Sequence, residues 1–271
     1  MRSKKDKHGL WLFGAVGAGF VAIFAAVALN SGKAKPGPDN CVGVVTANTV
    51  VVLDHSEQVT QQTRDEVLAR AMAYIREHVA INERVTVFSI SDHSRKALRP
   101  DVSLCRPPED GSRLTESVKL IRTRFQNNFE KPLREVLATT PLDGKESPIA
   151  QALTDISLTA YLRGNSNTLL IFSDMLEHTD KFSLYACSDP KDVIARYKAS
   201  RQGAQERPEF KNTTVVLNLI PRLDQSKVAL KCRDALWPWF FGNNAGTQAG
   251  LTFDYLPGGA SMSPGPQGSK K

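Results

Sequence analysis

Three polar side chains at alternate positions follow a run of apolar, mostly β-branched residues. The run covers residues 49–53, and Asp54, Ser56 and Gln58 come directly after it. Such a run is typical of a strand buried on both faces, as in a parallel α/β sheet. The three side chains are then expected at the carboxyl end of that strand, where open α/β sheets place their ligand sites.

A second predicted strand, residues 167–172, is also followed by a carboxylate, that of Asp174. The carboxyl ends of parallel strands lie on one edge of a sheet, so neighbouring strands would bring Asp54 and Asp174 within reach of one ion. Oxygen ligands without a Cys or His cluster suit a hard cation such as Mg²⁺, or Mn²⁺. Ser147 precedes a predicted helix and can present its hydroxyl at the same edge.

Each of these residues also has a purely structural interpretation. An aspartate at the end of a strand often caps the turn that follows, and Ser56 suits such a turn as well. Ser147 is followed by Pro148, which favours an ordinary helix with Ser147 as N-cap and Pro148 at the first helical position.

Strands and helices alternate along the chain, which predicts crossover connections and an α/β fold. The sheet is expected to be mostly parallel and central, with helices on both faces. Further strands are predicted over residues 83–90, 213–220 and 251–256, with an antiparallel edge strand near 101–105. Helices are predicted over residues 60–79, 114–139, 148–162, 189–201 and 225–239.

Two prolines fall within or beside these predicted helices. Pro132 should start, kink or break the helix over residues 114–139. Pro238 lies in the aromatic run 237–241 that ends the last helix. This run either closes an edge of the sheet or forms a partner-binding patch.

The N-terminal region predicts a membrane anchor. Residues 1–8 are basic, and residues 9–29 form a stretch of 21 residues without a charge. At 1.5 Å per residue a helix of this length spans a bilayer core of roughly 30 Å. The length favours a single-pass signal anchor over a cleaved signal peptide. The basic flank predicts a cytoplasmic N-terminus and an extracytoplasmic C-terminal domain, periplasmic in a bacterium.

The rest of the chain divides by composition. Residues 30–39 form a Gly/Pro/Lys linker, residues 40–257 the globular domain, and residues 258–271 a disordered tail. Of the net charge of +7, residues 1–8 contribute +3 (four basic residues and one acidic), which leaves about +4 without a long basic run. A nucleic-acid partner is therefore not expected.

The four cysteines agree with an extracytoplasmic domain. They are widely spaced, without a CxxC pair or metal-ligand spacing. An even number outside the cytoplasm suggests two disulfides, although four buried free thiols are the alternative. Three pairings are possible among Cys41, Cys105, Cys187 and Cys232.

Three segments resemble the signatures of a known family, the von Willebrand factor A (vWA) domains. Residues 54–58 resemble the DxSxS signature, and residues 147–153 resemble the Thr-containing stretch that opens a helix. Ser173-Asp174 resembles the family's strand-terminal Thr/Ser-Asp-Gly. The motifs occur in the family's order, and the resemblance covers about residues 40–256.

The resemblance implies a Rossmann-like, vWA-type fold with a metal-ion-dependent adhesion site at the top of the sheet. The ion in such a site can bind an acidic residue of a partner protein. The matching ligand positions in this chain are Asp54, Ser56, Ser147 and Asp174. Gln58 stands where Ser or Thr is usual, and Met175 stands where the family has glycine.

The leading functional hypothesis is a membrane-anchored module that binds another protein at the outer face of the membrane. One alternative is a Mg²⁺-dependent hydrolase, such as a nuclease, which would need a third carboxylate from Glu57, Glu177 or Asp92 beside Asp54 and Asp174. Another alternative is a degenerate scaffold that binds no ion. The sequence has neither a nucleophile elbow nor a Gly-rich phosphate loop, so an enzyme is not expected.

Overall fold

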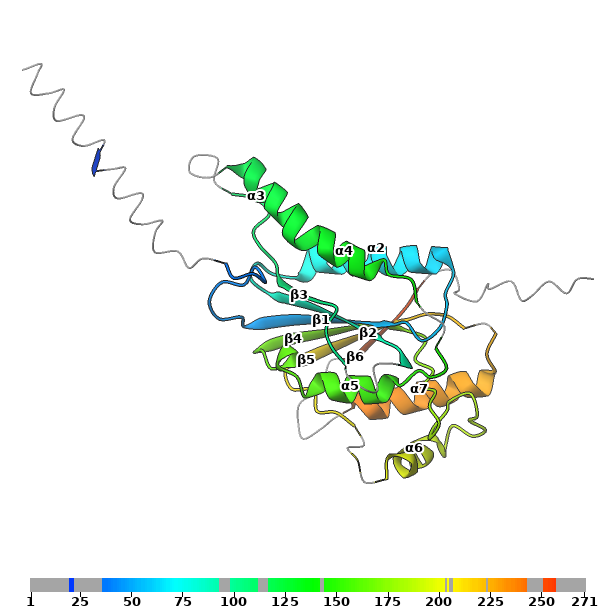
Figure 1. Cartoon of the computed structure of the whole chain (residues 1–271). Helices are drawn as coiled ribbons and strands as arrows, with labels where there is room; N and C mark the ends of the chain where they lie inside the picture. Colours follow the sequence, from blue (N-terminus) through cyan, green and yellow to red (C-terminus); the bar gives the residue numbers. More distant parts are fainter. Residues whose placement is uncertain are drawn as a thin grey trace, which may run out of the picture. The chain divides into compact units, whose positions relative to one another are not determined.

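Six strands form one sheet in the order β3-β2-β1-β4-β5-β6, as Figure 1 shows. The strands are β1 (Ala47–Asp54), β2 (Arg84–Ile90), β3 (Val102–Cys105), β4 (Ser166–Ser173), β5 (Thr213–Leu219) and β6 (Leu251–Tyr255). Only the edge strand β3 is antiparallel to its neighbour among these pairings. The predicted α/β class with a mostly parallel sheet is therefore confirmed, and so is the antiparallel edge strand.

The computed structural model describes residues 20–21, 36–92, 98–111, 117–141, 144–202, 204, 207–222, 224–242 and 251–256. Within these residues, no helix is both long and apolar enough to cross a membrane. The predicted span, residues 9–29, lies outside the described residues except for Phe20 and Val21. The basic segment 1–8 and the tail 258–271 also lie outside them, so the anchor stays a prediction.

β1 lies in the middle of the sheet, and its side chains enter hydrophobic cores on both faces. Val50 and Val52 belong to one core, whereas Val51 and Leu53 belong to the other, and all four are buried. Successive side chains of a strand point to opposite faces, so a strand covered on both sides needs an unbroken apolar run. This is the physical reason why residues 49–53 have their composition.

Helices cover both faces of the sheet (Figure 1). α2 (Gln61–His78) and α4 (Lys131–Leu137) lie on one face, and α5 (Ile149–Ser157) and α7 (Lys227–Phe241) lie on the other. The shorter α6 (Val193–Arg201) packs beside α7. Thr60 caps α2 by accepting the backbone N–H of Thr63 at 3.2 Å, which explains why that helix begins where the sequence predicts.

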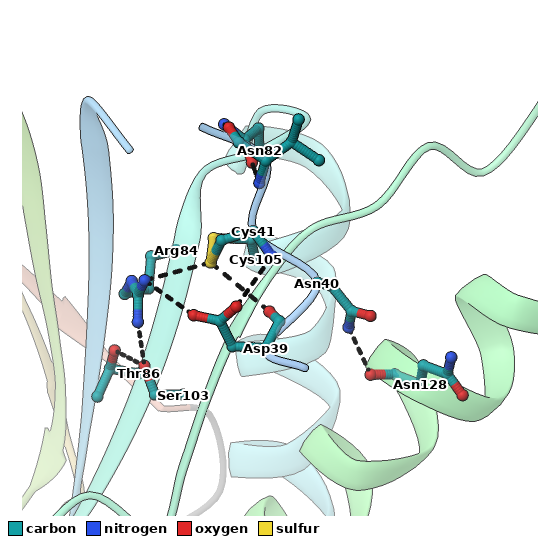
Figure 2. The surroundings of a disulfide bond; sticks show 10 residues. Asp39, Asn40, Cys41, Asn82, Arg84, Thr86, Ser103, Cys105 and Asn128 are labelled. Atoms are coloured by element: carbon teal, nitrogen blue, oxygen red, sulfur yellow. Dashed lines mark hydrogen bonds and ion pairs between the residues drawn. A yellow bond between two sulfur atoms is a disulfide. The ribbon is translucent and has the colours of Figure 1, made fainter. Parts of the chain in front are cut away.

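The predicted helix over residues 114–139 contains a π-helical turn. α3 (Val118–Phe125) passes through the turn Gln126–Glu130 into α4. Pro132 has no N–H and cannot bond the carbonyl of Asn128 in α-helical register. That carbonyl instead accepts the side-chain amide of Asn40 at 2.9 Å, as Figure 2 shows. The proline thus modifies the helix, and the carbonyl it leaves open fastens the segment that leads into the domain.

α7 extends to Phe241, beyond the predicted end at residue 239, although Pro238 lies inside it. An internal proline costs a helix roughly 3 kcal/mol. Trp237, Phe240 and Phe241 are all buried in the core on that face of the sheet. Burying one such side chain contributes about 2–3 kcal/mol, so packing outweighs the proline. This packing favours a structural role over partner binding, but the predicted closure of a sheet edge is wrong, because the run packs into the core on one face of the sheet.

All four cysteines form disulfides, which confirms the predicted number and selects one pairing. Cys41 bonds Cys105 with a Cα–Cα distance of 4.9 Å, and Cys187 bonds Cys232 with a Cα–Cα distance of 6.5 Å. Figure 2 shows the first of these beside Arg84, whose guanidinium pairs with Asp39 at 3.0 Å. The first disulfide thus fastens the segment preceding β1 to the edge strand β3.

Candidate functional site

β1 and β4 are neighbours, so the two aspartates that follow the predicted strands lie at one edge of the sheet. The register places Leu53 opposite Phe172, and Ser173 therefore ends β4 beside Asp54. The hydroxyl of Ser173 donates to Asp54 Oδ2 at 2.6 Å. The first and third of the motifs are thus joined directly, and Asp174 is the next residue along the chain.

Asp54 is surrounded by hydrogen-bond donors. Its Oδ1 accepts the hydroxyl of Ser56 at 2.6 Å and the backbone N–H of Ser56 at 3.1 Å. Its Oδ2 accepts the hydroxyl of Ser147 at 3.4 Å besides that of Ser173. Donors of this kind stabilise an ionised carboxylate, so Asp54 is the point at which the three motifs converge.

Ser147 reaches Asp54 because the loop before it is fastened to the edge. The carboxylate of Asp92 accepts the backbone N–H groups of Lys145 and Glu146, each at 2.8 Å. The N–H of Gly144 donates to the carbonyl of Ser56 at 2.9 Å. A Cβ on Gly144 would lie 2.7 Å from Asp92 Oδ1 and 3.0 Å from the carbonyl oxygen of Ser56, so a larger residue would displace the Asp92 carboxylate from this loop.

The predicted role of Ser147 as a helix cap is wrong. Pro148 is the N-cap of α5, and Ser147 exchanges backbone hydrogen bonds with His178. The start of α5 is satisfied instead by Glu177, whose carboxylate accepts the N–H of Ala150 at 2.8 Å. The Ser147 hydroxyl is therefore available to Asp54, which agrees with the functional interpretation of this residue.

Glu177 is 4% exposed. Burial raises the pKa of its carboxyl to about 8, and the backbone hydrogen bond from Ala150 opposes that shift. As a cap, Glu177 is not the third carboxylate that a hydrolase would need. Asp92 is equally committed to the loop before Ser147.

The side chain of Asp174 is buried at this edge of the sheet. Its Oδ1 accepts the N–H of Leu176 at 2.8 Å, and its Oδ2 accepts Arg222 Nη1 at 2.6 Å. Burial and the charge of Asp54 raise the pKa of Asp174 to about 7, against the opposing effect of Arg222. The carboxyl is thus shared between the backbone turn that follows β4 and a cation from another loop.

Met175, at the position of the family's glycine, adopts a left-handed backbone with φ of 59°. Its N–H donates to Ser173 Oγ at 2.7 Å, and its carbonyl accepts Trp237 Nε1 at 2.7 Å. Its side chain is buried in the core. A residue other than glycine needs such support to hold a left-handed backbone conformation. The turn therefore keeps the backbone shape that glycine favours, with a buried side chain where glycine has only a hydrogen atom.

Arg222 is a residue of this edge that the sequence reasoning missed. It lies three residues beyond the end of β5. Its Nη1 donates to Glu57 as well as to Asp174, while Nε and Nη2 each donate to Asp224 at 2.9 Å. β5 runs parallel to β4, so the rule that located Asp54 and Asp174 at strand ends also applies to this arginine.

Gln58 does not join the cluster. Its side chain is exposed and makes no hydrogen bond to another described residue. Glu57 takes part instead: it meets Arg222 and accepts the hydroxyl of Tyr185 at 2.6 Å. Of the five predicted ligand residues, Asp54, Ser56 and Ser147 are joined by hydrogen bonds, Asp174 follows directly on Ser173, and Gln58 lies apart.

The donor set fits a resident divalent ion poorly because the carboxylate of Asp174 is already paired with Arg222 at 2.6 Å. In the segments that the structure describes, no group of three His, Cys, Asp or Glu side chains is arranged to hold a metal, and the predicted ligand set itself has only two carboxylates. The positive charge at Asp174 and Glu57 comes from Arg222. Occupancy of this edge by Mg²⁺ or Mn²⁺ stays a prediction.

The edge presents a surface at this point. The cavity that borders Asp54, His55 and Arg64 measures about 30 Å³, which is room for a water molecule. Small-molecule sites are usually clefts of several hundred Å³. This cavity borders Asp54 but not Ser147, Asp174 or Arg222, so it is separate from the cluster.

No protein-family model matches the chain, and no curated protein matches it by sequence. Solved structures to which it is similar include VWA2, an ArnB paralog from Sulfolobus acidocaldarius (11% identity, TM-score 0.40, 79% of this chain and 42% of that one). They also include the SpRpn10 VWA domain (12% identity, TM-score 0.34, 80% of this chain and 93% of that one).

A third similar structure is an aerotolerance-related membrane protein from Bacteroides fragilis (10% identity, TM-score 0.32, 65% of this chain and 68% of that one). The chain thus spans less than half of the length of the Sulfolobus structure. Two of the three structures are VWA domains by name, the class whose motifs the sequence resembles. Identities and TM-scores of this size carry no functional argument, so we base the function on this chain's own residues.

Proposed function

We propose that the chain is a membrane-anchored, vWA-like interaction module that binds another protein through the carboxyl-terminal edge of its sheet. The observation that supports this best is the convergence of four separate segments on one rigid surface. They follow β1, precede α5, follow β4 and follow β5, and they are joined through Asp54 and Arg222. A preorganised surface of this kind loses little conformational entropy when a partner docks.

The exposed part of this surface is polar. The side chains of Glu57 and Asp224 are 42% and 47% exposed, and both are held in place by Arg222. Interfaces commonly use such fixed polar groups to orient a partner and to exclude wrong ones. We favour binding over catalysis because the carboxylates of this edge are already paired with serine hydroxyls and with Arg222.

The proposed location outside the cytoplasm is supported by the cysteines. Both disulfides join residues far apart in the sequence, 64 and 45 positions, and disulfides of this kind persist in oxidising compartments. Together with the basic residues 1–8 and the uncharged stretch 9–29, they favour a chain anchored at its N-terminus with its domain outside.

The proposal is tested by photo-crosslinking of the full chain in the membranes of its own cells. A photo-crosslinking amino acid replaces Gln58, which is exposed at the edge. The matched control carries it at Lys211, whose side chain is 75% exposed and which precedes β5 at the other end of the sheet. We expect a discrete protein adduct from position 58 and none from position 211. Equal adduct yields from both positions would contradict a partner site at this edge.

A further inference from the structure

The cation at the carboxyl-terminal edge belongs to the chain itself. We infer that Arg222 is a built-in substitute for a divalent ion, so that this edge is assembled and binds its partner without metal. The inference extends the proposed function, and only its statement about the partner rests on that function. The role of Arg222 as the cation of the site can be tested without any partner.

The contacts of Arg222 are those of a central cation. Its guanidinium donates to three carboxylates from three different segments: Glu57 after β1, Asp174 after β4 and Asp224 on its own loop. Its side chain is only 14% exposed. A charge that several carboxylates hold away from water is harder to displace from its partners than a charge in a surface ion pair.

Asp224 orients the guanidinium. It accepts from both Nε and Nη2 at 2.9 Å, a two-point contact that fixes the plane of the group. This leaves Nη1 directed at Asp174 and Glu57. Tyr185 positions Glu57 from the other side through its hydroxyl, at 2.6 Å. The cation is therefore built into the loop and is held from both sides.

The electrostatics agree with a permanent charge at this place. Burial lowers the pKa of Arg222, but the hydrogen bonds with Asp224 and the charges of Asp174 and Glu57 outweigh it and raise that pKa above its ordinary value. The hydrogen bonds from Arg222 lower the pKa of Asp224 to about 2. The guanidinium and the carboxylate of Asp224 thus stay ionised over the whole physiological range.

The oxygens of Asp54 are also occupied from within the chain. Three serine hydroxyls and one backbone N–H donate to this carboxylate. A metal ligated by Asp174 would have to displace the guanidinium from that carboxylate, and a metal ligated by Asp54 would compete with these donors for the lone pairs of its oxygens. The departures at Gln58 and Met175 fit this arrangement, because Gln58 faces solvent and the side chain of Met175 is buried in the core, so neither supplies a ligand.

The test measures binding of Mn²⁺ alone to the full chain in detergent, by the electron paramagnetic resonance signal of free Mn²⁺. We expect no stoichiometric binding to the wild-type chain. Arg222→Gln removes the built-in charge and frees Asp174 and Glu57, and we expect Mn²⁺ to bind it about tenfold or more tightly than wild type because a cation no longer meets a like charge. Arg222→Lys is the matched control: it keeps a positive charge, and should bind Mn²⁺ no better than wild type.

Three outcomes would overturn the inference. They are stoichiometric Mn²⁺ binding by the wild-type chain, equal gains in Arg222→Gln and Arg222→Lys, and absence of any gain in a folded Arg222→Gln chain. If Arg222→Gln does not fold, thermal unfolding of the wild-type chain decides: a midpoint that is the same in Mn²⁺ and in chelator supports the inference, and a higher midpoint in Mn²⁺ contradicts it.

The partner gives an independent readout. The crosslinked adduct from position 58 should form equally with and without chelator. Loss of the adduct in chelator alone would contradict metal-free binding. Absence of the adduct in both conditions would contradict the proposed function and leave the Mn²⁺ result to stand by itself.

Discussion

At the scale of single residues, buried carboxyls connect the fold to the pH of its surroundings. Glu177 caps α5 from inside the protein, and burial raises its pKa from 4.5 to about 8. Burial and the charge of Asp54 raise the pKa of Asp174 from 3.8 to about 7. The folded chain therefore holds protons that the unfolded chain has already released over this range. Stability should fall as the pH rises from about 4 to about 8, through the window between these pKa values.

Glu177→Gln tests the larger of these effects. The amide keeps an oxygen that can accept the N–H of Ala150 but has no proton to release. We expect the variant to be more stable than wild type at pH 8, and its stability to change less between pH 5 and pH 8. Urea unfolding at several pH values measures this. Glu135→Gln, at a carboxylate that is 66% exposed, should leave the pH dependence of wild type unchanged.

An unchanged pH slope in Glu177→Gln would show that this carboxyl titrates normally in the folded chain. The cap would then be an ordinary ionised one, with its charge balanced by the N-terminus of α5 and by Arg201.

At the scale of elements, α7 supports the turn that presents Asp174. Trp237 is 1% exposed, and its Nε1 donates to the carbonyl of Met175, the residue with left-handed backbone. Cys232 of the same helix bonds Cys187 in the loop beyond that turn. Arg233, also in α7, donates to the carbonyl of Asp174 at 3.3 Å. A core helix thus holds the loop that follows β4 by two hydrogen bonds and one disulfide.

Trp237→Phe tests the contribution of the helix. The substitution leaves the Met175 carbonyl without its donor and also leaves a cavity in the core, so we expect a loss of about 3 kcal/mol in the free energy of unfolding. Trp239→Phe is the matched control. Trp239 is only partly buried, with Lys198 and Arg207 over its ring, and its substitution should cost about 1 kcal/mol or less.

Denaturant unfolding of both variants measures the difference. Equal losses from the two substitutions would mean that the hydrogen bond to Met175 adds nothing beyond ordinary packing. α7 would then hold the loop that follows β4 through Arg233 and the disulfide.

At the scale of the whole molecule, two disulfides brace separate parts of the domain. Cys41–Cys105 fastens the segment preceding β1 to β3, and Cys187–Cys232 fastens the loop that follows β4 to α7. The bonded cysteines are 64 and 45 residues apart in the sequence. Loop-closure entropy assigns each of them about 4 kcal/mol of stabilisation. Such dependence suits a domain that folds outside the cytoplasm, where thiols are oxidised.

Comparison of oxidised and reduced chains tests this dependence. We expect reduction to lower the urea midpoint strongly, and the paired variants Cys41→Ser/Cys105→Ser and Cys187→Ser/Cys232→Ser each to lose up to about 4 kcal/mol. Alkylation before reduction should find no reactive thiol in chain taken directly from its cells. A fully alkylated native chain would contradict the proposed extracytoplasmic location.

Local sequence determined much of this protein. The apolar run 49–53 predicted a strand buried on both faces, because the alternation of side chains requires apolar residues at every position of such a strand. Polar residues directly after strands predicted the edge at which Asp54 and Asp174 meet, because parallel strands end on the same side. The number of disulfides also followed from the sequence, from four cysteines without metal-ligand spacing.

Tertiary structure decided what depends on strand order and on the paths of loops. The placement of β5 beside β4 brings Arg222 to Asp174, and no spacing in the sequence states which strands are neighbours. The pairing of the cysteines and the turn of Ser147 toward Asp54 instead of α5 depend on the same long-range geometry. The hydrophobic periodicity of the sequence indicates which side chains are buried. Contacts between distant segments form only when the strands assemble into the sheet. The identity of the cation at this edge is therefore a property of the fold.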